Sequence, residues 1–202
     1  GIDITQPEGH MIIDIGGGTS DIAVISLSGV VESSSIKIAG DQFNEAVIKY
    51  MRRKHNLLVG ERTAEQMKMQ IGCVFPPEEE SSMEVKGRCL LTGLPKLISV
   101  TSTEMMEAFE EPVERIMEEV HLVLEKTPPE LVADISNNGI VMTGGGSLVR
   151  GFDKLVTART GIHAMVAENA IQCVAEGTGK SLDSIQDMQD GTMNLSRRKQ
   201  IN

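Results

Sequence analysis

The sequence predicts an α/β fold, and three patterns support this prediction. Short apolar runs at 11–15 and 22–25 have the length of buried strands. After Gly40 the apolar residues recur at helical spacing instead. A further strand-like run at 140–142 is again followed by a glycine triplet and a helical segment. The chain therefore alternates between strands and helices.

Residues 11–39 predict an antiparallel meander of three short strands. Its first turn is marked by the three glycines at 16–18, and its second by Ser28-Gly29. Two helices are expected after the meander. The first should begin at Asp41, which can cap a helix, and end near His55. The second should follow Gly60.

The start of the second helix and the segment after it have their own signals. Thr63 and Gln66 have the spacing of a capping box. Strands at 83–87 and 97–100 are expected to pair with each other, with Leu94-Pro95 in their connection. The middle of the chain should therefore contain a small antiparallel unit.

A long helix is expected after the second of these strands. Thr101 and Glu104 again have capping-box spacing, and an apolar stripe continues from there to Leu124. Pro112 interrupts the stripe and is expected to kink or split the helix, because proline lacks a backbone N–H.

The last third of the chain should contain several short elements. Leu148 and Phe152 are expected to face inward from one of its helices, and residues 184–202 are expected to form a flexible tail. The elements before the tail are, in order, a short helix starting at Pro128-Pro129, a buried strand at 140–142, a helix starting near Ser147, a strand at 163–166 and a helix at 170–182.

Composition excludes several classes of function. The chain has 202 residues, of which 40% are hydrophobic and 24% charged, so a folded core is expected rather than disorder. A net charge of -10 and an aromatic content of 2% argue against nucleic-acid binding, which needs basic surface and stacking rings. The three cysteines have no pairing pattern, which indicates a reducing compartment. No apolar run reaches the ~18 residues that a transmembrane helix needs.

The first glycine turn carries residues suited to phosphate chemistry. Gly17 and Gly18 would let backbone N–H groups approach a phosphate closely, and Thr19 could donate to a phosphate oxygen or orient a water. Asp14 could act through a hydrated Mg²⁺, which prefers carboxylates and retained waters. The alternative is an ordinary glycine-rich hairpin turn.

The second glycine turn lies between a strand and a helix. The helix N-terminal N–H groups would point into this turn, which suits an anion or the sugar of a nucleotide. The alternative is close packing of the strand against the helix. The pattern is neither a Walker loop nor a dinucleotide fingerprint. The residues concerned are Gly145, Gly146, Ser147 and Leu148.

Between the two turns, Glu65 and Lys68 are three residues apart and share a helix face. Taken alone, they are most simply a surface ion pair that contributes little energy. The four histidines have no metal-ligand spacing, and no nucleophile elbow is present.

Several strings in the chain resemble the MreB family of bacterial actin-like rod-shape proteins. The resemblance covers roughly residues 1–183, and several of the strings are specific to this family. They are MIIDIGGGTSD, AGD, NLLVGERTAE, LTGLPK, LEKTPPEL, GIVMTGGG and CVAEGTG.

The resemblance implies an actin-like ATPase fold, of which this chain looks like the C-terminal half alone. The half would be a ribonuclease H-like mixed sheet flanked by helices, made of residues 1–71 and 124–183. A small α+β subdomain at 72–123 would be inserted into it. The family's first phosphate loop has no counterpart here, so we expect either an artificial or a natural fragment of a longer protein.

The resemblance also implies a site for ATP and Mg²⁺. Gly17, Gly18 and Thr19 would contact the phosphates, with Asp14 near the metal. Glu65, Gln66, Met67 and Lys68 would border the ribose and adenine. The other side of the nucleotide would be closed by Gly145, Gly146, Ser147 and Leu148.

The function implied is ATP-dependent filament formation that maintains rod cell shape by organising peptidoglycan synthesis. The expected partners are other copies of the protein, the cell-wall elongation machinery and the cytoplasmic face of the membrane, the last through the missing half. Two alternatives stay open. One is another ATPase of the superfamily, such as a sugar kinase or a heat-shock chaperone. The other is a half-domain that does not hydrolyse ATP.

Overall fold

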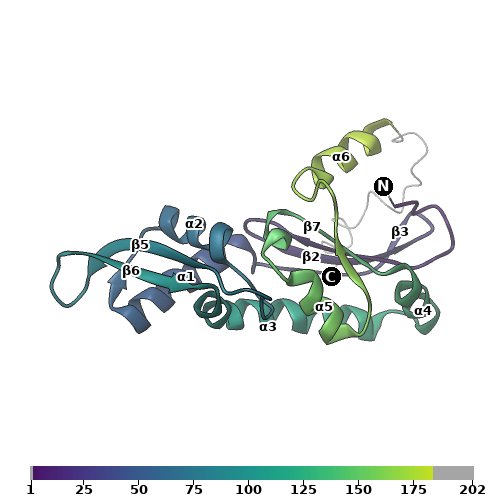
Figure 1. The fold of residues 1–202 in the computed structure, drawn as a ribbon. Helices are drawn as coiled ribbons and strands as arrows, with labels where there is room; N and C mark the ends of the chain where they lie inside the picture. Colours follow the sequence, from purple (N-terminus) through teal and green to yellow (C-terminus); the bar gives the residue numbers. More distant parts are fainter. Residues whose placement is uncertain (1, 184–202) are drawn as a thin grey trace, which may run out of the picture.

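The fold is described from a computed structural model, which places residues 2–183. It contains two sheets, one with the strand order β3-β2-β1-β7-β8 and one with the order β4-β5-β6. Figure 1 shows an elongated molecule, with the β5–β6 hairpin at one end and α4 at the other. The mixed α/β fold predicted from the sequence is confirmed.

The five-stranded sheet is built on the N-terminal meander. Strands β1 (His10–Ile15), β2 (Ser20–Ser26) and β3 (Gly29–Ile36) pair antiparallel in sequence order, which confirms the predicted meander. Strand β1 also pairs parallel with β7 (Ile140–Thr143), which pairs parallel with β8 (Ala164–Val166). Strand β1 is thus central, and alternate residues along it are fully buried.

Helix α1 (Gly40–His55) ends where the sequence predicts but starts differently. Its N-cap is Ala39, whose N–H donates to Gln42 Oε1 at 2.9 Å, while Asp41 lies in the first turn. The prediction of Asp41 as the cap is therefore wrong. Gln42, three residues after the cap, bonds the cap backbone instead.

Helix α2 (Glu61–Ile71) follows Gly60 as predicted, but it is capped differently. Its N-cap is Gly60, which makes no side-chain cap bond. The backbone N–H of Thr63 donates to the carbonyl of Gly60 at 3.0 Å, so Thr63 already lies inside the first turn. The predicted capping box of Thr63 and Gln66 is therefore wrong.

The three-stranded sheet consists of β4 (Leu57–Leu58), β5 (Ser82–Cys89) and β6 (Pro95–Thr101). Strands β5 and β6 form the predicted antiparallel pair. Pro95 begins β6 rather than lying in the connection, a position that proline tolerates because it ends the ladder. The short β4 reaches this sheet from the segment between α1 and α2.

Helix α3 (Ser102–Lys126) has the predicted capping box. Glu104 N–H donates to Thr101 Oγ1 at 3.4 Å, and Thr101 N–H donates to Glu104 Oε2 at 3.0 Å. The helix continues through the buried Pro112, so the predicted split does not occur. Apolar residues before and after the proline pack into the core, and their burial offsets its cost of about 3 kcal/mol.

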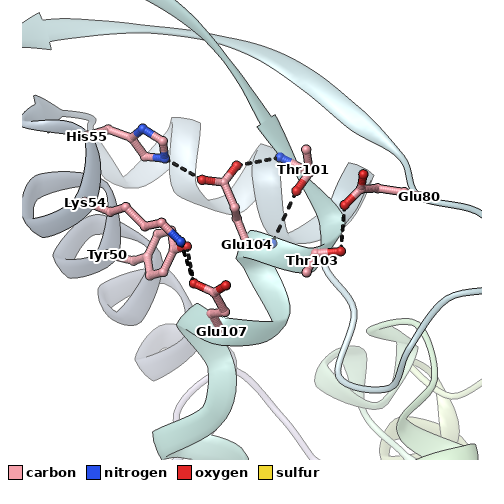
Figure 2. Close-up of polar contacts among 8 residues, drawn as sticks. All are labelled: Tyr50, Lys54, His55, Glu80, Thr101, Thr103, Glu104 and Glu107. Atoms are coloured by element: carbon pink, nitrogen blue, oxygen red, sulfur yellow. Dashed lines mark hydrogen bonds and ion pairs between the residues drawn. The ribbon is translucent and has the colours of Figure 1, made fainter.

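Three polar contacts connect α1 to the start of α3 (Figure 2). His55 Nε2 lies 2.6 Å from Glu104 Oε1. Glu107 accepts hydrogen bonds from Tyr50 Oη at 2.6 Å and from Lys54 Nζ at 2.7 Å, and these bonds lower the pKa of Glu107. Together they hold the end of α1 against the first turns of α3.

The remaining elements follow the predicted order with one correction. Helix α4 (Pro129–Asn138) starts at the proline pair as predicted. After β7 the chain forms a short 3-10 helix, η1 (Gly145–Leu148), and only then α5 (Phe152–Thr160). Leu148 is 53% exposed, so the predicted inward position of Leu148 is wrong, whereas Phe152 is buried. The helical conformation is interrupted between η1 and α5 at Gly151, which has a φ of 81°.

The last described helix is α6 (Cys173–Asp183), close to the predicted range. Its apolar residues Val174 and Leu182 are exposed. Figure 1 shows α6 standing apart from the rest of the fold, above the five-stranded sheet. The predicted flexible tail at 184–202 lies outside the described residues.

Three phenylalanines join the helices α1, α3 and α5. The ring of Phe43 in α1 lies edge-on to Phe109 in α3, with centroids 5.0 Å apart, and to Phe152 in α5, at 6.2 Å. All three side chains are buried. The core therefore fixes α1, which carries one wall of the site described next.

Candidate functional site

A cleft of about 480 Å³ lies where the two glycine turns, α1 and α2 come together. The first turn and the start of α1 form one wall, and α2 and η1 contribute the others. Its lining residues are Gly16, Gly17, Gly40, Asp41, Glu65, Lys68, Met69, Gly72, Gly145, Gly146, Leu148, Val149, Arg150 and Ile171.

Hydrogen bonds to the backbone carbonyls of the first glycine turn hold this turn against the start of α1. The N–H groups of Gly40 and Asp41 donate to the carbonyls of Gly16 and Gly17, at 3.0 and 2.8 Å. Gly17 and Gly18 are exposed, and within residues 2–183 neither donates its N–H in a hydrogen bond. These two N–H groups are thus available to an anion.

Asp14 lies at the end of β1, next to this turn. Its Oδ1 atom is buried and has no hydrogen-bond partner among the described residues. Burial raises the pKa of Asp14, and the charge of Asp21 adds to this, while a hydrogen bond from Thr143 opposes it. An unpartnered carboxylate oxygen is suited to a cation or to a water bound by one.

No group of three or more metal-ligating side chains occurs in the described part of the chain. A cation beside Asp14 would therefore take most of its ligands from water and from a bound anion. Mg²⁺ has this preference, since it keeps several waters and adds substrate phosphates.

The second glycine turn packs against the end of β1, where the first turn begins. Gly144 has a φ of 82°, and a Cβ placed there would lie 2.3 Å from the carbonyl oxygen of Ile15. Only glycine therefore fits at this contact. A Cβ on Gly145 would meet nothing within 4 Å, because this residue faces the open cleft.

Glu65 and Lys68 form more than a surface ion pair. Lys68 Nζ donates to Glu65 Oε2 at 2.7 Å and to the carbonyl of Gly40 at 3.2 Å, and the Lys68 side chain is only 10% exposed. Burial alone would raise the pKa of Glu65. Hydrogen bonds from Lys68 and Asn44 outweigh that effect, so the pKa of Glu65 is lowered.

The structure brings about half of the predicted site residues to the cleft. Met67 is buried in the core and Gln66 is exposed away from the lining, because a helix presents only every third or fourth residue to one side. Ser147 is buried, and its hydroxyl donates to the carbonyl of Gly144 at 2.7 Å. The residues at the cleft are Gly17, Glu65, Lys68, Gly145, Gly146 and Leu148.

Three other predicted residues, Asp14, Gly18 and Thr19, lie near the cleft without lining it. Gly18 and Thr19 are exposed at the tip of the first turn. Thr19 Oγ1 donates to Asp21 Oδ2 at 3.0 Å. Its hydroxyl is therefore already engaged by a neighbouring carboxylate.

The sequence predictions missed several residues of the cleft. Arg150 is exposed at its edge, where its guanidinium donates to the carbonyl of Gly72 at 3.3 Å and to Ser81 Oγ at 2.7 Å. These contacts join residues far apart in the chain, so no local spacing signals them. Gly40 and Asp41 could have been found, since they follow the meander directly.

Comparison with known proteins identifies the family. A family model described as MreB/Mbl protein matches residues 1–190. The chain belongs to the MreB/Mbl family. It is 48% identical over 193 residues to the cell shape-determining protein MreB of Escherichia coli strain K12, a match that covers 96% of this chain and 55% of that protein. It is also 48% identical over 185 residues to the cell shape-determining protein Mbl of Bacillus subtilis strain 168, covering 92% of this chain and 56% of Mbl.

Solved MreB structures have the same fold. MreB5 of Spiroplasma citri bound to ADP superposes with a TM-score of 0.89 at 41% identity, covering 92% of this chain and 56% of that one. A MamK double helical filament gives a TM-score of 0.67 at 24% identity, a likeness that concerns the fold alone. The chain therefore spans about half the length of the MreB/Mbl relatives it matches. No helix among residues 2–183 is long and apolar enough to cross a membrane.

Proposed function

We propose that this MreB/Mbl chain is the C-terminal half of an actin-like cytoskeletal protein that binds an adenine nucleotide with Mg²⁺. The observation that carries the proposal is the cleft itself. Two glycine turns meet there, the N–H groups of Gly17 and Gly18 are unbonded within the described chain, and Asp14 holds an unpartnered buried oxygen. The related MreB5 of Spiroplasma citri was solved with ADP and with AMPPNP.

The groups in the cleft and beside it have roles that suit a nucleoside triphosphate. Gly17, Gly18 and Thr19 would bind the phosphates, and Asp14 would hold Mg²⁺ through water. A bound Mg²⁺ neutralises charge on the phosphate oxygens. Thr19 would also help to orient the attacking water.

The remaining lining would hold the sugar and base. Glu65 and Lys68 would border them on the α2 side, with Gln66 and Met67 supporting the helix from outside the cleft. Gly145, Gly146 and Leu148 would close the opposite side, with Ser147 fixing the turn from behind. The second half of the protein would cover the open face.

The biological role follows from the family. We propose ATP-dependent filaments that maintain rod cell shape by organising peptidoglycan synthesis at the cytoplasmic face of the membrane, through elements outside this chain. Head-to-tail contacts that do not close into a ring generate such filaments. Residues 1–71 and 124–183 would form the larger subdomain, and 72–123 the smaller inserted one.

Calorimetry of Mg-ATP binding tests the proposal. We expect weak binding by the 202-residue chain, and tight binding with hydrolysis by a longer version that carries the other half. Tight binding and turnover by the 202-residue chain alone would contradict a site shared between two halves. Absence of binding by both would remove the nucleotide from the proposal.

A further inference from the structure

We propose that Asn44 is a positioning residue of the cleft, which holds Glu65 so that one of its carboxylate oxygens can accept a hydrogen bond from a ribose hydroxyl. The inference rests on the proposed nucleotide function and adds a residue that lies behind the cleft lining. Asn44 belongs to α1, whereas Glu65 and Lys68 belong to α2.

The hydrogen bonds of Glu65 leave one oxygen available. Asn44 Nδ2 donates to Glu65 Oε2 at 2.6 Å, and Lys68 Nζ donates to the same oxygen at 2.7 Å. Within residues 2–183, every hydrogen bond that the Glu65 carboxylate accepts ends on Oε2. The side chain is 43% exposed and lines the cleft, so Oε1 is available to a ligand.

The chemistry of this oxygen selects the ligand group. An ionised carboxylate only accepts hydrogen bonds, so the ligand must present a donor. The phosphates of a nucleotide are themselves acceptors and carry negative charge, so they are repelled from this oxygen. A ribose hydroxyl is a neutral donor and can approach it.

The burial of Asn44 indicates that its amide has more than a packing role. Asn44 is 5% exposed, and its Oδ1 atom is buried without a partner among the described residues. An apolar side chain of similar size would fill this position without an unpaired polar atom. The bond from Nδ2 to Glu65 is the interaction that an apolar residue could not replace.

A neutral donor also suits the charge of the site. Lys68 is held by Glu65 Oε2 and by the carbonyl of Gly40, so it supplies one positive charge to one carboxylate. A second carboxylate at position 44 would lie against Glu65 and compete for Lys68. Asn44 donates to Glu65 without changing this balance.

The first test measures the position of Glu65 without nucleotide. The carboxyl carbon of Glu65 is followed by NMR through a pH titration of the 202-residue chain, with Asn44→Leu and Asn44→Asp as variants. We expect the pKa of Glu65 to rise in both, since each loses the amide donor. Glu45→Gln, on the exposed face of α1, is the matched control and should leave that pKa unchanged. An unchanged titration in a folded Asn44 variant overturns the proposal.

The second test separates positioning from general damage to the cleft. Binding of Mg-ATP and of Mg-2′-deoxy-ATP is measured by calorimetry for the longer version that carries the other half, with and without the same substitutions. Asn44→Leu is expected to weaken ATP binding about tenfold, a change of about 1.4 kcal/mol, and to weaken 2′-deoxy-ATP binding much less. An equal loss for both nucleotides would mean that Asn44 acts only through folding, which overturns the proposal.

Absence of nucleotide binding and failure of a variant to fold are interpreted separately. If the unsubstituted longer version binds neither nucleotide, the proposed function loses support, while the NMR titration still decides whether Asn44 positions Glu65. If Asn44→Leu fails to fold, Asn44→Ala decides, because it removes the amide donor without adding bulk or charge. Its titration and its ratio of ATP to 2′-deoxy-ATP affinity carry the same expectations.

Discussion

At the scale of single residues, Asp14 has a buried carboxylate oxygen, Oδ1, that has no hydrogen-bond partner within residues 2–183. Because its pKa is raised in the folded chain, the protonated form is favoured by folding. This favourable contribution is complete below the unfolded pKa of about 3.9 and is lost as the pH rises through the folded value. At neutral pH the charged carboxylate therefore lowers the stability of the fold.

This balance predicts that Asp14→Asn stabilises the chain at pH 7 by about 1 kcal/mol, with the gain shrinking as the pH falls toward 4. Urea denaturation at several pH values measures it. Asp21→Asn removes only the exposed neighbouring charge and should give a smaller gain. A loss of stability at pH 7 in Asp14→Asn would show that the charge is compensated in the folded state.

The glycines of the second turn give a matched pair of variants. Gly144→Ala places a Cβ against the Ile15 carbonyl at a positive φ, so we expect a loss of about 3 kcal/mol in the free energy of unfolding. Gly145→Ala meets open space and should change stability by less than about 1 kcal/mol. Equal effects of the two variants in urea denaturation would contradict the close contact between the turns.

At the scale of elements, the start of α3 depends on Glu104. Its carboxylate accepts from the Thr101 N–H and contacts His55, so it joins the end of β6, the start of α3 and the end of α1 (Figure 2). The Glu104 side chain thereby connects strand β6 of the three-stranded sheet to the helices α1 and α3.

We expect Glu104→Ala to destabilise the chain by about 1–2 kcal/mol, measured as a shift of the thermal midpoint. Glu104→Gln keeps an acceptor for the Thr101 N–H and should cost less than half as much. If Ala and Gln cost the same, the contact of the Glu104 carboxylate with His55 would matter more than the cap.

The elements also show what the sequence could and could not predict. The meander and the β5–β6 hairpin were predictable, because alternating burial and glycine turns are local signals. The start of α2 after Gly60 was predictable, but its cap was not, because a backbone bond from Thr63 to Gly60 takes the place of a side-chain cap. Asn44 and Arg150 were missed because their partners lie far along the chain, and only the packed fold brings them together.

At the scale of the whole molecule, the exposed apolar residues of α6 are the main feature. Val174 is 58% exposed and Leu182 62%, on a helix that stands apart from the sheets (Figure 1). Exposed apolar surface of this kind promotes association between molecules.

We therefore expect the 202-residue chain to self-associate, and the double variant Val174→Gln with Leu182→Gln to shift sedimentation velocity profiles toward the monomer. The control is Leu91→Gln with Leu94→Gln, which changes the exposed leucines at the tip of the β5–β6 hairpin instead. Monomers produced only by the hairpin variant would assign the association to that tip.

The parallel pairing of β1 with β7 has a consequence for synthesis of the chain. Met11 pairs with Ile140, so the central ladder joins residues from opposite ends of the described sequence. The meander can form early from local contacts, whereas this pairing must close a long loop, which slows folding. During synthesis on the ribosome, the edge of β1 that pairs with β7 stays unpaired until β7 has left the exit tunnel. The cleft between the two glycine turns is thus among the last features of the protein to form, and a chain stalled before Ile140 would expose that edge to chaperones and proteases.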